Sequence, residues 1–370
     1  MATRKPTRKK VVSVVGARPQ FVKLGPVAAA LDEAGHEHVI VHTGQHYDDR
    51  LSDVFFADLD IPAPAVHLGI GSGSHGVQTG AMLSALDGVL DAQRPDWVLV
   101  YGDTNSTLAG ALAAVKLHLP VAHLEAGLRS FNRAMPEEHN RVLTDHACDL
   151  LLAPTQVAVA HLAAEGLAGR TVLVGDVMTD VCLRVRDAVA AAAPPRPAEL
   201  AAHPQGNGDY LVATIHRAEN TDDPDRLARI VAALAALPLP VLLLAHPRLV
   251  ARAAHAGVDL RAGAVLPGRP LPYPQTVAAV LGSRGVVTDS GGLQKEAFLL
   301  GVPCTTVRTE TEWTETLDAG WNVLGGADDV LADPGRFAEL VLRPRPDASR
   351  GTPFGDGKAA ERVTEALSAS

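Results

Sequence analysis

The sequence predicts an α/β protein built from two doubly wound domains that face a central cleft. Three observations carry this prediction. The chain has 370 residues, which is too long for one compact core and suits two domains of ordinary size. Short Val, Leu and Ile runs alternate with Ala-rich helical stretches. A segment rich in Pro, Ala and Gly at residues 188–209 interrupts this alternation near the middle.

The apolar runs are the predicted strands. Continuous apolar strands separated by helices indicate parallel sheets that are covered on both faces. The runs expected in the first domain are residues 11–15, 38–42, 97–101, 120–124, 149–153 and 171–175. Those expected in the second domain are residues 210–215, 240–246, 285–289 and 302–307.

Breaks in this pattern predict the domain boundaries. We expect an N-terminal domain over residues 1–187, a linker over 188–209 with some helix at its start, and a C-terminal domain over 210–356. Glycines and prolines at residues 350–357 break the chain again before a helical end. This last helix, residues 357–370, could pack back on the first domain.

The composition argues against two classes of partner. The formal net charge is −9, whereas a general nucleic-acid binder needs a clustered basic face. The one basic cluster, residues 1–10, runs straight into the first strand and is interpreted as a solvated tail. It lacks the apolar stretch of a secretory signal, and no apolar run approaches the roughly 18 residues of a membrane span. We therefore expect a cytoplasmic protein that binds neither nucleic acid nor a membrane.

The sequence contains three patterns that often indicate a metal or cofactor site, but each of them is incomplete. The cysteines 148, 182 and 304 are isolated and odd in number, so buried thiols are expected. No His pair with metal-ligand spacing lies beside a convincing carboxylate. The glycines of residues 71–76 fit GxGxxG, but the acidic residue that should end the next strand is missing. We assign no metal and no cofactor.

Two turns at the carboxyl ends of predicted strands suit an anionic ligand, and this is where open α/β sheets bind ligands. Arg18 and Lys23 begin a helix, where the helix dipole disfavours cations unless an anion compensates. Ser290, Gly291 and Gly292 open another helix, and free N–H groups there suit a diphosphate. The alternative is that Ser290 and the aspartate before it only cap this helix.

Titratable residues follow several of the same strands. Asp103 either caps the next helix or takes part in catalysis. His216 can act as an acid or base near neutrality, or it caps the next turn. The stretch HLEAGLRSFNRAMPEEHNR, residues 123–141, adds Glu125 and Glu137, either as part of a solvated face or as further acids and bases.

Seven motifs carry a resemblance to a known family: GARP, GDTNSTL, HLEAGLR, MPEEHNR, HRAEN, TDSGGLQKEA and RTETE. In this order and spacing, the chain resembles the non-hydrolysing UDP-N-acetylglucosamine 2-epimerases from about residue 11 to its end. The resemblance implies a glycosyltransferase-B-like pair of Rossmann domains, usually a homodimer, that interconverts UDP-GlcNAc and UDP-ManNAc without NAD or metal. It also implies elimination of UDP to 2-acetamidoglucal, followed by re-addition of UDP.

The resemblance implies roles for individual residues. The catalytic residues are Asp103, Glu125, Glu137 and His216. The substrate-binding residues are Arg18, Lys23, Ser290, Gly291, Gly292, Glu296 and Arg308, of which Glu296 matches the acid that holds the ribose diol. Preorganised cations and N–H dipoles suit the expulsion of UDP. Acid and base groups on both faces of the sugar suit inversion at C2.

Two departures from the family pattern concern the substrate. The family loop often reads TERPE, but residues 311–315 read TEWTE, and the indole of Trp313 could stack on a sugar or base but cannot grip phosphate as arginine does. A family aromatic near the uracil is replaced by Thr276, which leaves Tyr273 as the nearest substitute. The competing functions are a hydrolysing epimerase that releases ManNAc and UDP, an epimerase of a modified UDP-acetamido sugar, a glycosyltransferase, and a non-catalytic UDP-sugar sensor.

Overall fold

A computed structural model describes residues 8–45, 62–192, 196–203, 208–318 and 320–369, without the side chains of residues 18 and 19. The chain divides into two compact units. Unit 1 comprises Met1–Val181 and Thr352–Ser370, and unit 2 comprises Cys182–Gly351. The division falls inside a continuous helix, α7 (Val177–Ala192), rather than at the start of the Pro-rich segment.

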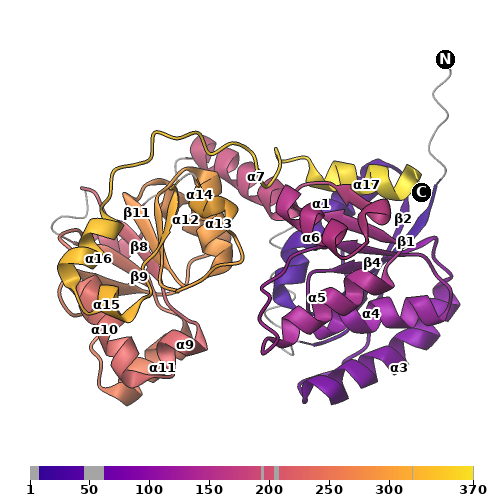
Figure 1. Ribbon diagram of the computed structural model, residues 1–370, viewed down its shortest axis with the longest axis horizontal. Coiled ribbons are helices and arrows are strands. Elements are labelled where there is room, and N and C mark those ends of the chain that lie inside the picture. The colour runs from indigo at the N-terminus through magenta and orange to yellow at the C-terminus, as the bar shows by residue number, and fades with distance from the viewer. Residues whose placement is uncertain (1–7, 46–61, 193–195, 204–207, 319, 370) are drawn as a thin grey trace. The chain divides into compact units, whose positions relative to one another are not determined.

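Unit 1 is built on a seven-stranded parallel sheet with the order β3-β2-β1-β4-β5-β6-β7. Figure 1 labels β1, β2 and β4 of this sheet. The strand order reverses between the neighbours β1 and β4, and ligands of doubly wound folds bind at such a switch point. The strands are β1 (Lys10–Val15), β2 (Glu37–His42), β3 (Val66–His67), β4 (Trp97–Tyr101), β5 (Val121–Leu124), β6 (Leu150–Ala153) and β7 (Thr171–Leu173).

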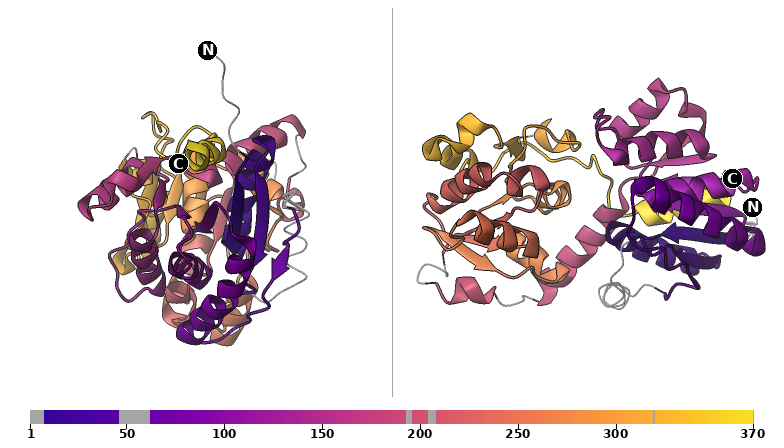
Figure 2. Two further views of the ribbon diagram at one scale, coloured as in Figure 1. Left: turned by 90° about the vertical axis from the view of Figure 1, so that its right-hand side faces the viewer. Right: turned by 90° about the horizontal axis from the view of Figure 1, so that it is seen from below.

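Both faces of this sheet are covered because alternate residues of β1 enter two different cores. Val11 and Val15 pack with α1 and α17, and Val12 and Val14 pack with α3 and α4. Leu367 of α17 is fully buried in the α1 core, so the C-terminal helix completes unit 1 (Figure 2). The helices are α1 (Arg18–Glu33), α3 (His75–Gln93), α4 (Asn105–Lys116), α5 (Pro136–Ala147), α6 (Gln156–Ala164), the 3₁₀ turn η1 (Ala168–Arg170) and α17 (Ala359–Ala369).

Unit 2 repeats this plan with a six-stranded parallel sheet in the order β10-β9-β8-β11-β12-β13, which reverses between β8 and β11. The strands are β8 (Leu211–Thr214), β9 (Val241–Leu244), β10 (Val265–Gly268), β11 (Gly285–Thr288), β12 (Cys304–Thr306) and β13 (Asn322–Leu324). The helices are α8 (Ala198–Ala201), α9 (Ala218–Thr221), α10 (Pro224–Ala235), α11 (Pro247–Ala256), α12 (Tyr273–Leu281), α13 (Gly291–Leu300), α14 (Glu315–Asp318), α15 (Asp328–Leu331) and α16 (Pro334–Val341).

The predicted fold class of two Rossmann-like doubly wound domains is confirmed, and every predicted run contains a strand. The three strands that the sequence did not indicate, β3, β10 and β13, all lie at sheet edges. Each is short, and β10 contains Pro267, which an edge strand tolerates because one side of its backbone has no partner. These strands therefore lack the continuous apolar run that predicts a central strand.

Candidate active site

The residues predicted from sequence fall into two groups, one in each unit, in the segments that follow the strands at the switch point or the strand next to it. The unit 1 group follows β1, β4 and β5 and contains Lys23, Asp103, Glu125 and Glu137. The unit 2 group follows β8, β11 and β12 and contains His216, Ser290, Gly291, Gly292, Glu296 and Arg308. The side chain of Arg18 lies outside the described residues.

Lys23 and Glu125 form an ion pair in unit 1, and each side chain is only 12% exposed. Burial lowers the pKa of Lys23, but the charges of Glu125, Asp176 and Asp103 outweigh burial and leave the pKa raised. Lys23 therefore stays cationic among three carboxylates. Glu125 itself has a φ of +72°, a left-handed conformation that is rare for a residue with a side chain and is often found at functional sites.

Gly102 allows the backbone to approach this ion pair closely, and Gly127 allows it to approach α6. A Cβ on Gly102, which has a φ of +62°, would lie 3.2 Å from Oε2 of Glu125 and 3.5 Å from Nζ of Lys23. A Cβ on Gly127, which has a φ of +84°, would lie 2.5 Å from the carbonyl oxygen of Ala158. The turn before Asp103 and the turn after Glu125 therefore both need glycine.

Asp103 does not cap the helix that follows it. Thr104 is the N-cap residue of α4, and its N–H donates to Oγ1 of Thr107 at 3.1 Å. The carboxylate of Asp103 instead accepts a hydrogen bond from Nη2 of Arg141 at 2.6 Å, and its carbonyl accepts one from Nδ2 of Asn140 at 2.9 Å. The capping alternative is therefore wrong, and α5 holds the Asp103 turn.

The adjacent acids Glu137 and Glu138 at the start of α5 have different surroundings. Glu138 is buried, and its carboxylate accepts hydrogen bonds from Ser130 and Phe131 at 2.9 Å and from Arg141 at 3.1 Å. Burial raises the pKa of Glu138, but the hydrogen bonds from Ser130 outweigh burial and lower it. No ion pair from the described residues reaches Glu137, which is half-buried. Glu138 therefore orders the loop, and Glu137 is the less constrained acid.

An ionic network with a fully buried centre at His123 and Asp145 lies next to the unit 1 group. Nδ1 of His123 lies 2.7 Å from Oδ1 of Asp145, and its Nε2 lies 2.7 Å from the carbonyl oxygen of Gly102. Arg129 forms ion pairs with two acids. Its Nη1 lies 2.7 Å from Oδ2 of Asp145, and its Nε lies 2.8 Å from Oε1 of Glu165. Sequence reasoning missed Asp145, because an aspartate within a helix carries no motif that reveals its burial.

Asp289 organises the unit 2 group. This fully buried carboxylate accepts hydrogen bonds from the backbone N–H groups of His216 and Arg217 at 3.0 Å and from Nδ2 of Asn220 at 3.0 Å. Nδ1 of His216 lies 3.3 Å from the same carboxylate, and the ring is exposed. Neither His216 nor Asp289 is the N-cap residue of the helix that follows it. The alternative that these side chains only cap a helix is therefore wrong for both residues.

The amino terminus of α13 combines a cap with open backbone. The hydroxyl of Ser290 accepts a hydrogen bond from the N–H of Leu293 at 3.4 Å, so Ser290 caps α13, which was the alternative to an anion-binding role for this serine. Gly292 is exposed, and a Cβ there would meet only the Ser290 hydroxyl at 3.7 Å. Packing within unit 2 does not require glycine at this position, which suits the approach of a ligand to the helix end.

The loop after β12 places charged and aromatic groups beside this helix end. Nη1 of the buried Arg308 donates to Oε2 of Glu312 at 2.8 Å. Trp313 is only 6% exposed, and Nζ of Lys295 lies 4.0 Å from the centroid of its ring. The indole therefore packs within unit 2, contrary to the expectation that it could stack on a sugar or base.

Glu296 lies on α13 beside two groups that sequence reasoning did not connect with it. Burial raises the pKa of the Tyr273 hydroxyl, and the negative charge of Glu296 raises it further. Burial likewise raises the pKa of the Cys182 thiol to about 12, with Glu296 contributing. Tyr273 and Cys182 are therefore neutral near pH 7 and provide an uncharged wall next to this acid.

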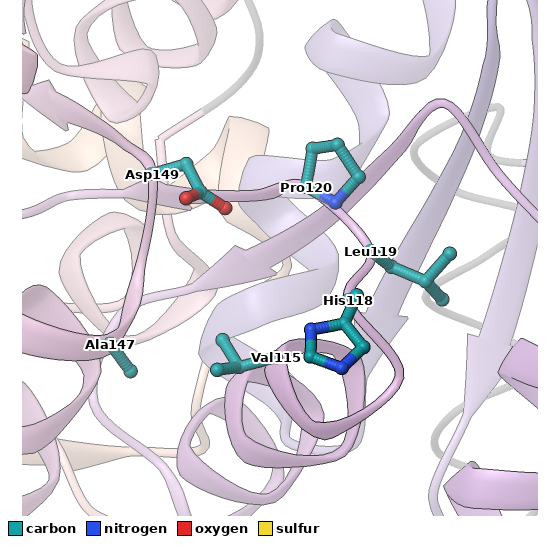
Figure 3. Close-up of a pocket in the computed structure, with 6 residues that line it drawn as sticks. All are labelled: Val115, His118, Leu119, Pro120, Ala147 and Asp149. Atoms are coloured by element: carbon teal, nitrogen blue, oxygen red, sulfur yellow. The ribbon is translucent and has the colours of Figure 1, made fainter.

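A separate pocket of about 330 Å³ lies at the amino ends of two unit 1 strands, opposite to the candidate site (Figure 3). His118, which lines it, precedes β5, and Asp149 precedes β6, so the pocket is at the amino ends of these strands. Its position separates it from the candidate site.

The described residues contain no group of three or more His, Cys, Asp or Glu side chains that could hold a metal ion. The three cysteines are buried and free, as predicted. Over the described parts of the chain, no helix is long and apolar enough to cross a membrane.

Comparison with known families matches residues 29–368 to the family described as UDP-N-acetylglucosamine 2-epimerase. The chain is 44% identical to a UDP-2,3-diacetamido-2,3-dideoxy-D-glucuronate 2-epimerase from Pseudomonas aeruginosa, over 97% of this chain and 99% of that protein. It is 38% identical to a UDP-N-acetylglucosamine 2-epimerase from Methanocaldococcus jannaschii, over 97% and 98% of the two chains.

Solved structures show the same similarity. The Methanocaldococcus jannaschii UDP-GlcNAc 2-epimerase in complex with UDP-GlcNAc and UDP has a TM-score of 0.83 and 37% identity, over 98% of this chain and 100% of that one. A lipopolysaccharide outer core galactosyltransferase has a TM-score of 0.56 at 12% identity, over 97% and 99% of the chains. The similarity to the galactosyltransferase shows a shared fold and nothing about function.

Proposed function

Because the chain belongs to the UDP-N-acetylglucosamine 2-epimerase family, we propose that it reversibly epimerises C2 of UDP-GlcNAc to give UDP-ManNAc. The observation that supports the proposal is the ion pair of Lys23 and Glu125 with Asp103 nearby, together with the position of Glu137 at the start of α5, the helix that holds the Asp103 turn. Inversion of a carbon next to the anomeric centre needs acid and base groups, and three carboxylates with one buried lysine supply them.

The proposed route is elimination and re-addition. A carboxylate removes the C2 proton, the C2–H electron pair forms the C1=C2 double bond of 2-acetamidoglucal, and the C1–O bond breaks as its electrons leave with UDP. In the return step, a UDP oxygen attacks C1, and a second acid protonates C2 on the other face. Glu137 suits the base, because no ion pair among the described residues engages its carboxylate, whereas the carboxylate of Glu125 is paired with Lys23.

Unit 2 is proposed to receive the diphosphate. The exposed backbone of Gly292 at the α13 amino terminus and the guanidinium of Arg308 are suited to negative charge that grows as UDP leaves. His216, which Asp289 holds in place, supplies a further donor. Glu296 is proposed to bind the ribose hydroxyls. No nicotinamide is needed in this route, because no electrons pass to an acceptor.

The experiment that tests the function is incubation of the protein with UDP-GlcNAc in D₂O, followed by NMR. An epimerase must place deuterium at C2 and accumulate UDP-ManNAc. Release of free ManNAc and UDP would identify a hydrolysing epimerase instead. Binding without C2 exchange would identify a UDP-sugar sensor, and turnover that requires an added acceptor would identify a glycosyltransferase.

A modified UDP-acetamido sugar is the second candidate substrate. The Pseudomonas aeruginosa relative, at 44% identity, acts on a 2,3-diacetamido glucuronate. Both substrates present the same C2 proton and the same diphosphate, so the residues assigned above serve either one. Comparison of kcat/KM for UDP-GlcNAc and for UDP-2,3-diacetamido-2,3-dideoxy-D-glucuronate decides between them.

Replacing Arg308 with methionine should weaken UDP binding about ten- to a hundredfold, since charge-assisted hydrogen bonds to phosphate contribute about 1.5–3 kcal/mol. Isothermal titration with UDP measures this change. Arg284→Met is the matched control, because Arg284 is exposed and precedes β11 at the opposite end of the sheet. Equal UDP affinities in the two variants would show that Arg308 does not bind the diphosphate.

A further inference from the structure

Glu312 lies against the same helix end that is proposed to bind diphosphate. An ideal Cβ on Gly291, the first residue of α13, would lie only 2.4 Å from Oε1 of Glu312 and 3.1 Å from Nε1 of Trp313. Glycine at position 291 is therefore explained within unit 2 by the Glu312 side chain. Gly292 differs, because its surroundings are open.

The guanidinium groups around Glu312 are also those suited to the diphosphate. Nη1 of Arg308 donates to Oε2 at 2.8 Å, and Nη2 of Arg217 lies 3.8 Å from Oε1. Burial raises the pKa of Glu312, but the charges of Arg308 and Arg217 and the hydrogen bonds to its carboxylate together outweigh burial and lower the pKa. The Glu312 side chain is therefore an anion at neutral pH, and its one negative charge offsets part of the positive charge of Arg308 and Arg217.

The backbone on both sides of Glu312 is anchored to α13. The hydroxyl of Thr311 donates to Oε1 of Gln294 at 2.8 Å, and Nε2 of the same Gln294 donates to Oγ1 of Thr316 at 2.7 Å. The Thr316 hydroxyl donates in turn to the carbonyl of Trp313 at 2.7 Å. Glu312 can therefore leave Gly291 by rotation of its side chain, without movement of the loop.

We propose that Glu312 competes with the diphosphate of a UDP-sugar for Arg308 and for the amino terminus of α13. This inference rests on the proposed function, because it takes the α13 end as the diphosphate site. A carboxylate and a diphosphate repel each other when both are within a few ångströms of one helix end. The side chain must therefore swing away when UDP binds, and Glu312 limits the affinity of the site for UDP.

The test compares Glu312→Gln with Glu310→Gln, a control that removes the same charge from an exposed position in the same loop. Isothermal titration measures the Kd of each for UDP and for uridine. Glu312→Gln should bind UDP about tenfold more tightly than wild type, which corresponds to about 1.4 kcal/mol. Uridine affinity should not change, because uridine carries no phosphate, and Glu310→Gln should match wild type for both ligands.

A second variant separates charge from shape. Glu312→Asp keeps the negative charge but withdraws it from Gly291 by one methylene, so its UDP affinity should fall between those of wild type and Glu312→Gln. Unchanged or weaker UDP binding by a folded Glu312→Gln protein would overturn the inference and make Glu312 a support for Arg308. Failure of the wild type to bind UDP at all would instead contradict the proposed function.

Discussion

Replacing Glu137 with glutamine is expected to lower the rate of deuterium incorporation at C2 of UDP-GlcNAc by about 10²–10⁴-fold, the usual contribution of a general base. Glutamine keeps the shape of the side chain but cannot accept the C2 proton. UDP affinity should stay within about twofold, because the diphosphate is assigned to residues of unit 2. NMR in D₂O measures the exchange rate, and titration with UDP measures the affinity.

The control for this prediction is Glu361→Gln, which removes a carboxylate from an exposed position on α17. It should exchange C2 deuterium at the wild-type rate. Near-normal exchange in Glu137→Gln would reassign the base to Glu125 or Asp103, each of which is paired with a cation in unit 1. Loss of exchange together with a large loss of UDP affinity would indicate a binding role for Glu137.

The central strands could be predicted from sequence because each is buried on both faces and therefore reads as a continuous apolar run. The edge strand β7 was also predicted, but the edge strands β3, β10 and β13 were not, since β3 has two residues and β10 has a proline that only an edge tolerates. The division between the units also escaped prediction. α7 continues across Val181, so no change of composition marks the point where packing passes from one core to the other.

The candidate site shows a similar limit. Lys23 and Glu125 stand in motifs that suggest function, but 102 positions separate them, and only the parallel sheet brings them together. The partners that orient such motif residues are harder to find. For Asp289 the sequence suggests only the alternative of a helix cap, because an aspartate before a helix usually has that role. In the structure, the loop after β8 supplies its donors, and no local pattern encodes that pairing.

Replacing the buried Asp145 with asparagine is expected to cost about 3–5 kcal/mol of unfolding free energy at pH 7, the usual penalty for breaking one side of a buried ion pair. Asp145 accepts from Nδ1 of His123 and Nη1 of Arg129 at 2.7 Å and from the N–H of Gly127 at 3.1 Å. Asparagine keeps the volume but leaves Arg129 with only Glu165 as a charged partner. Urea unfolding that follows the transition of unit 1 measures the loss, with the exposed Asp87→Asn as control.

The stability difference between wild type and Asp145→Asn should change in a definite direction as the pH falls. Burial raises the pKa of Asp145, but His123 and Arg129 outweigh burial and hold the pKa below its ordinary value of 3.8. A carboxyl with a depressed pKa contributes stability that is fully present above its unfolded-state pKa and is lost as the pH falls through its folded-state pKa. The difference between wild type and Asp145→Asn should therefore be largest at neutral pH and shrink below about pH 4. A difference that stays constant down to pH 3 would mean that the lost stability comes from hydrogen-bond geometry at Gly127 rather than from charge.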